Sequence, residues 1–167
     1  MLRRSIIAAA AVTALVVPRP AAAMSYSPLD QYLLQSSIQG DRFEIAGGKL
    51  AQSKGSKPAV KALGARLVKD HRKSLADAVK VAKRLKIFVP KTPTPSEEWE
   101  LGIVGGLSGA DFDRAYTSLE VQDHKQDIDD MKTEVTDGMN ASVRHLARTD
   151  LPVLREHLKL SRAAQAG

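Results

Sequence analysis

Three histidines of this sequence each follow an acidic residue directly. They form the steps Asp70-His71, Asp123-His124 and Glu156-His157. Neutral imidazole together with carboxylate is a competent ligand set for zinc, iron, manganese or copper. A carboxylate can also orient a ligating imidazole by accepting a hydrogen bond from its second nitrogen. These residue types therefore predict either a site for a transition metal or small ligand, or a structural network of buried polar pairs.

Helical periodicity places the histidines on buried faces. Leu67, His71 and Leu75 are spaced i, i+4 and i+8, so their side chains share one face of a helix. His124 and His157 lie on apolar stripes of the same kind. The remaining histidine, at position 145, lies off its stripe, and we expect it to be exposed.

The depth of these histidines along their helices predicts that they meet. His71 and His124 lie about thirteen and fourteen residues into their helices, and His157 lies about seventeen into its own, which is roughly 20–25 Å from each helix start. In an antiparallel bundle such positions share one level of the core, where these folds hold metals. Glu44 has a similar depth, beside three glycines that indicate close approach of a neighbouring helix or ligand. The predicted ligands are Glu44, His71, His124 and His157, supported by Asp70, Glu120, Asp123 and Glu156.

Capping signals and apolar stripes predict four long helices. They cover residues 28–54, 58–87 and 108–137, with the last beginning after Asn140. Short turns join the first helix to the second and the third to the fourth, which indicates two antiparallel hairpins. Pro152 is expected to kink the fourth helix or restart it, because proline removes a backbone hydrogen bond.

A proline-rich stretch separates the two hairpins. It contains a short predicted helix over residues 96–104, which Thr94 and Glu97 cap as a capping box. A connection of about twenty residues is typical of bundles with one long crossover, as in ferritin-like folds. The expected fold is therefore all-α: an antiparallel, ferritin-like four-helix bundle with a long crossover between helices two and three.

The first 23 residues have the features of a cleaved signal peptide. Arg3-Arg4 precede an apolar run over residues 6–17, and Ala21-Ala22-Ala23 offers a cleavage site. The run is short for a membrane span, although an uncleaved anchor is the alternative interpretation. We expect a single domain over residues 24–167, exported to the periplasm or secreted, with no transmembrane segment after cleavage.

Composition argues against several classes of function. The chain has no Cys, which excludes disulfides, thiolate metal ligands and a cysteine nucleophile. Without Arg3, Arg4 and Arg19, the 25 basic residues fall to 22 against 19 acidic residues, a balance that does not indicate a nucleic-acid partner. No phosphate-binding glycine loop, nucleophile elbow or His-Glu-x-x-His motif is present, so no enzymatic reaction is predicted.

Several segments together resemble an exported bacterial family known as domain of unknown function 4142. They are residues 43–51, 67–71, 112–116, 123–124 and 151–158. The resemblance extends over roughly residues 27–160 and implies an envelope-associated, ferritin-like bundle without an established activity. The Glu-x-x-His motif of di-iron bundles is missing, because Val68, Val121 and Leu154 stand three residues before the histidines. We therefore expect at most one His-rich centre.

Two functions follow from these features. In the first, an exported helical protein binds a transition metal (Zn, Fe, Mn or Cu) or a small ligand in its core and acts in envelope stress. In the second, the protein is a non-enzymatic structural or interaction module of the cell envelope, and its His–acid pairs are only structural. Its envelope partner would then contact the basic outer face of the second helix or the crossover around Trp99. The oligomeric state is not indicated.

Overall fold

The computed structural model describes residues 25–167, which form five α-helices and no strand. The all-α prediction is confirmed. The helices are α1 (Pro28–Lys54), α2 (Pro58–Leu85), α3 (Pro95–Gly105), α4 (Gly109–Asp137) and α5 (Ala141–Ala166). The predicted signal peptide, residues 1–23, lies outside the described residues.

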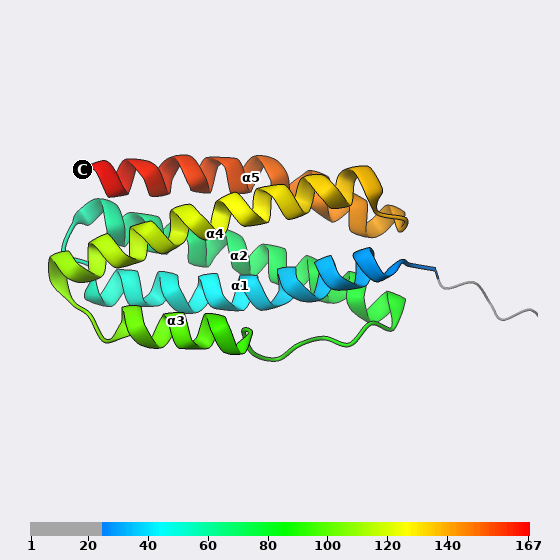
Figure 1. Ribbon diagram of the computed structural model, residues 1–167, viewed down its shortest axis with the longest axis horizontal. Helices are drawn as coiled ribbons and strands as arrows, with labels where there is room; N and C mark the ends of the chain where they lie inside the picture. Colours follow the sequence, from blue (N-terminus) through cyan, green and yellow to red (C-terminus); the bar gives the residue numbers. More distant parts are fainter. Residues whose placement is uncertain (1–24) are drawn as a thin grey trace, which may run out of the picture.

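Four of the helices are long and run side by side along the longest axis of the molecule (Figure 1). α1 packs mainly against α2, and α4 packs mainly against α5. Contacts between α2 and α5 and between α1 and α4 enclose a common core. The short helix α3 lies in the connection between α2 and α4 and packs against α1. The short helix predicted over residues 96–104 is therefore present as α3, and with it the structure has five helices rather than a bundle of four alone.

Local capping explains where several helices begin. Ser27 and Asp30 form a capping box at the start of α1, and Thr94 with Glu97 forms another at the start of α3. The side chain of Asn140 accepts hydrogen bonds from two backbone N–H groups in the first turn of α5. These polar side chains satisfy donors that a helix start would otherwise leave without partners.

Helix α5 continues through Pro152, so the predicted restart does not occur. Pro152 cannot donate to the carbonyl of Arg148, four residues earlier. Both residues are exposed, so water can hydrogen-bond to that carbonyl. Packing of Ala147 and Leu154 into the core on either side of the proline keeps α5 one helix.

Two glycines bring α1 and α2 into backbone contact. A Cβ atom on Gly48 would lie 2.6 Å from the carbonyl oxygen of Gly64, and one on Gly64 would lie 2.5 Å from the carbonyl oxygen of Gly48. Each distance is too short for a side chain. Of the three glycines near Glu44, Gly48 is therefore explained by the close approach of α2.

A polar layer divides the apolar core. One apolar cluster includes Ile38 of α1 and Leu154 of α5, and the other includes Ala51 of α1 and Ala164 of α5. Each long helix also carries buried titratable residues that lie in sequence between its residues of the two clusters. These polar residues are Asp41, Glu44, His71, Glu120, His124 and His157. No helix within residues 25–167 is long and apolar enough to cross a membrane.

Candidate metal centre

The side chains of His71, His124 and His157 meet in the polar layer. Their ring centroids are 5.8 Å apart for His71 and His124, 5.1 Å for His71 and His157, and 5.3 Å for His124 and His157. All three residues are at most 5% exposed. One nitrogen from each ring lies within 4.8 Å of the other two. One metal ion could therefore contact all three rings.

Hydrogen bonds fix the second nitrogen of two of these rings. Nδ1 of His124 lies 2.9 Å from the backbone carbonyl of Glu120, and a carbonyl only accepts, so this nitrogen carries a hydrogen. Nε2 of His157 lies 3.0 Å from Oδ2 of Asp70, which also pairs with Arg66. Burial raises the pKa of Asp70, but the hydrogen bonds from Arg66 and His157 outweigh burial and lower it. Asp70 is therefore an ionised acceptor, and Nε2 of His157 donates to it.

The third ring is held by an acid on α1. Nδ1 of His71 lies 2.8 Å from Oδ1 of Asp41, and both residues are buried. Nε2 of His71 is buried without a hydrogen-bond partner. Burial lowers the pKa of His71, but the hydrogen bond and charge of Asp41 outweigh burial and raise it. His71 therefore keeps one nitrogen for Asp41 and turns the other into the core.

The hydrogen bonds of His124 and His157 leave two lone pairs facing each other. Nε2 of His124 lies 3.3 Å from Nδ1 of His157, and each ring carries its hydrogen on the opposite nitrogen. Burial lowers the pKa of His124 to about 3 and that of His157 to about 4, so both rings are neutral at pH 7. Two acceptors at this separation repel each other unless a cation or a proton lies between them. The arrangement is therefore suited to a cation.

Two buried carboxyl groups lie on the other side of His124. Oε1 of Glu44 and Oε2 of Glu120 are 3.8 Å and 3.6 Å from Nδ1 of His124. Burial raises the pKa of Glu44 well above its usual value, and the charges of Glu120 and Asp123 add to this rise. Burial also raises the pKa of Glu120 to about 7. These carboxyl groups, with His124, form a second set of possible metal ligands.

The supporting acids lie in different surroundings. Asp70 contacts His157 rather than its sequence neighbour His71, because adjacent residues on a helix do not face each other. The Glu156 side chain is 43% exposed and lies 3.5 Å from Lys159, outside the cluster. Asp123 has a buried carboxylate oxygen without a partner, and burial raises its pKa.

Asp41, which holds His71, was not among the site residues predicted from the sequence. It lies three residues before Glu44, and residues at this spacing share a helix face. This spacing could have indicated that Asp41 faces the core together with Glu44. The fourth histidine, His145, is exposed as predicted.

Comparison with known proteins identifies the family of this chain. A family described as Domain of unknown function (DUF4142) matches residues 15–164. The chain belongs to the DUF4142 family. The family predicted from the sequence segments is thus confirmed. No curated protein matches this DUF4142 sequence.

A crystal structure of a DUF305 fragment from Deinococcus radiodurans has a similar fold. It superposes on the DUF4142 chain with a TM-score of 0.74 at 13% sequence identity. The match covers 84% of the DUF4142 chain and 97% of the DUF305 fragment. At this identity the likeness concerns the fold alone.

Proposed function

We propose that this DUF4142 protein binds one divalent transition-metal ion through Nε2 of His71, Nε2 of His124 and Nδ1 of His157. The observation that carries the proposal is the 3.3 Å approach of two ring nitrogens that both lack a hydrogen. Imidazole ligands suit zinc, copper and iron. For a site of a given ligand set, affinity generally rises from manganese and iron to copper, so copper and zinc should bind most tightly.

The partners of the three rings support this proposal. Asp41, the carbonyl of Glu120 and Asp70 each hold the nitrogen that would not face the ion. Such outer partners fix the tautomer and orientation of metal-ligating histidines. Three protein ligands would leave a fourth coordination position for water or a small ligand.

The pKa of His71 gives the proposed site a pH dependence. A proton on Nε2 of His71 competes with the metal for the same lone pair. Because Asp41 raises the pKa of His71, this competition should begin at a higher pH than for an ordinary imidazole. Metal affinity should therefore decrease as the pH falls.

The fold and compartment complete the proposal. The four long helices would form a ferritin-like bundle, supported by the single long connection between α2 and α4 that contains α3. The signal-like residues 1–23 favour export, so the protein would act in the periplasm or cell envelope. A role in envelope stress is consistent with metal binding there.

Metal content after dialysis tests the proposal. Untagged protein is stripped with a chelator, dialysed against Zn²⁺ or Cu²⁺, and analysed for metal. We expect one ion per chain for the wild type and none for His124→Gln. The matched control is His145→Gln, which removes an exposed histidine outside the cluster and should retain one ion. Equal metal content in the wild type and His124→Gln would refute the site and favour a purely structural role of the buried His–acid pairs.

A further inference from the structure

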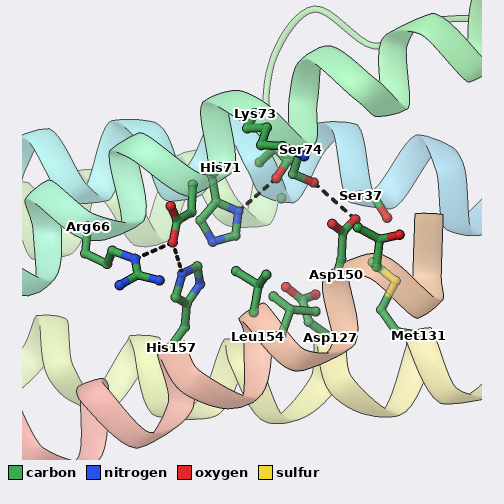
Figure 2. A pocket seen from close by; sticks show the side chains of 15 residues that line it. Ser37, Arg66, His71, Lys73, Ser74, Asp127, Met131, Asp150, Leu154 and His157 are labelled. Atoms are coloured by element: carbon green, nitrogen blue, oxygen red, sulfur yellow. Dashed lines mark hydrogen bonds and ion pairs between the residues drawn. The ribbon is translucent and has the colours of Figure 1, made fainter.

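A pocket of about 200 Å³ lies beside the proposed ligands. Residues from all four long helices line it, including Ser37 of α1, Ser74 of α2, Asp127 of α4 and Asp150 of α5. Figure 2 shows His71 and His157 toward one end of this pocket, with Ser37, Ser74 and Asp150 toward the other. The pocket therefore leads toward the imidazoles from one side of the bundle.

The charge of the pocket wall is unbalanced. Four aspartates line the pocket, at positions 41, 70, 127 and 150. The two basic lining residues already have acidic partners, because Arg66 pairs with Asp70 and Nζ of Lys73 lies 3.1 Å from Oδ2 of Asp77. Among the residues that the structure describes, Asp127 and Asp150 form no ion pair with a basic side chain. Burial and the charges of Asp123 and Asp41 raise the pKa of Asp127 well above its usual value, so this carboxyl group becomes charged when a cation takes the place of its proton. The wall is therefore suited to a cation rather than to an anion.

Two buried atoms of lining residues add to this argument. Oδ2 of Asp41 and Nε2 of His71 both lack hydrogen-bond partners, and both residues are at most 5% exposed. Both atoms accept hydrogen bonds or coordinate metals when unprotonated. The hydroxyl groups of Ser37, Ser74 and Thr149 supply further oxygen atoms on the wall. A hydrated cation could thus exchange its water for protein oxygen as it moves inward.

Repulsion between the acids of the pocket wall affects Asp150. Its Oδ2 lies 3.4 Å from the hydroxyl group of Ser74, a long hydrogen bond. Burial and the charge of Asp41 raise the pKa of Asp150 to about 6. A cation near Asp150 would relieve this repulsion.

We propose that this pocket is the route by which a hydrated divalent cation reaches the three imidazoles, with Asp127 and Asp150 as its transient outer binding site. This inference rests on the proposed metal site and adds how the metal arrives. The outer carboxylates would attract the ion and raise its rate of association. They would contribute less to the final affinity, because the bound ion lies on the histidines.

The rate of metal uptake in variants that lack a carboxyl group of the pocket tests the route. Stopped-flow mixing of chelator-stripped, untagged protein with Co²⁺ follows binding through the absorbance of the bound ion. Above about pH 6, where Asp150 is ionised, we expect Asp150→Asn to lower the association rate at least about threefold at low salt and to weaken its dependence on ionic strength. Asp127→Asn should also lower the rate, because it removes a carboxyl group that could exchange its proton for the cation. The matched control is Asp129→Asn, which neutralises an exposed acid of α4 that pairs with Lys132. It should leave the rate unchanged.

A steric variant tests the same route without changing charge. Gly40 lines the pocket, and a Cβ atom there would meet no atom within 4 Å. Gly40→Leu should therefore fold and narrow the pocket, slowing Co²⁺ association and dissociation together by at least about threefold. Gly102→Leu in α3 is the matched control, since Gly102 is equally unobstructed and does not line the pocket. Both replacements gain similar helix propensity, so a rate change confined to Gly40→Leu would come from the pocket.

The outcomes separate this inference from the metal site itself. Wild-type rates for Asp150→Asn, Asp127→Asn and Gly40→Leu, with one bound ion each, would overturn the route and leave the histidine site intact. No metal uptake by the wild type would overturn both. Slower uptake in all three variants with retained stoichiometry is the result that the route predicts.

Discussion

Nε2 of His124 faces Nδ1 of His157 at 3.3 Å, and neither nitrogen carries a hydrogen in the neutral rings. This relationship follows from two ordinary contacts, the hydrogen bond to the carbonyl of Glu120 and the one to Asp70. Without a cation or an additional proton, the two lone pairs repel each other. The same contacts that orient the rings therefore make the site selective for a positive charge.

Changing Asp70 should weaken metal binding. Asp70→Asn replaces an ionised acceptor of the His157 Nε2–H with a neutral amide and removes the charge that pairs with Arg66. Loss of such an outer partner typically costs about 10–100-fold in metal affinity. Competition with a chromophoric chelator measures this change. Asp77→Asn, on the outer side of α2, is the control, and an equal effect of both variants would argue against a specific role of Asp70.

Metal binding should stabilise the folded protein. An ion that binds only the native state at 100 times its Kd adds about 2.7 kcal/mol to the free energy of unfolding. We expect this gain with Zn²⁺ in the wild type and no gain in His124→Gln, measured by chemical denaturation at pH 7.5. Stabilisation of the same size in both proteins would show that the ion binds elsewhere.

The contact between α1 and α2 should tolerate no side chain at its closest point. Gly64→Ala would force a Cβ atom against the Gly48 backbone, and overpacking of this kind costs about 1–3 kcal/mol. Gly40→Ala meets no neighbour and should instead gain up to about 1 kcal/mol from helix propensity. Urea denaturation of the two variants measures both changes in the free energy of unfolding, a decrease for Gly64→Ala and an increase for Gly40→Ala. A stabilised Gly64→Ala protein would contradict the close helix contact.

Glu134 should make stability decrease as the pH rises. Burial and the neighbouring charge of Asp30 raise the pKa of Glu134 to about 8, from 4.5 for an ordinary glutamate. Between these values the folded protein holds a proton that the unfolded chain has lost. By proton linkage, the contribution of this group is fully present below about pH 4.5 and is lost as the pH rises through about 8.

The Glu134→Gln variant isolates this effect. Its amide is neutral at every pH, so its stability relative to the wild type should improve between pH 5.5 and pH 8.5. Chemical denaturation at the two pH values measures the difference, and the other titrating groups cancel in the comparison. Parallel pH dependences of the two proteins would show that Glu134 does not retain its proton in the folded state.

The meeting of the three histidines was predictable, because depth along a helix depends only on the number of residues and the rise per residue. The directions in which the acidic side chains point were harder to predict from the sequence. Glu156 follows Arg155 and precedes His157, and one residue turns a side chain by about 100° around the helix. Burial of His157 therefore leaves Glu156 half-exposed beside Lys159.

The contacts between helices could not be predicted in the same way. Asp70 lies beside His71 in sequence but holds His157 of α5, and His71 takes Asp41 of α1 instead. These pairings depend on how each helix is rotated about its axis, which is set by packing such as the glycine contact of α1 and α2. A single sequence records the spacing along each helix but not this rotation.

X-ray absorption of the Zn²⁺-loaded, untagged protein can decide whether the three imidazoles hold the metal, because it reports the atoms bound to the ion. The proposed site predicts three imidazole nitrogens at about 2.0–2.1 Å, with one further light ligand in the open position. His124→Gln should lose this signature, and His145→Gln should keep it. A first shell of oxygen atoms without imidazole, or an unchanged spectrum in His124→Gln, would contradict a metal centre built on His71, His124 and His157.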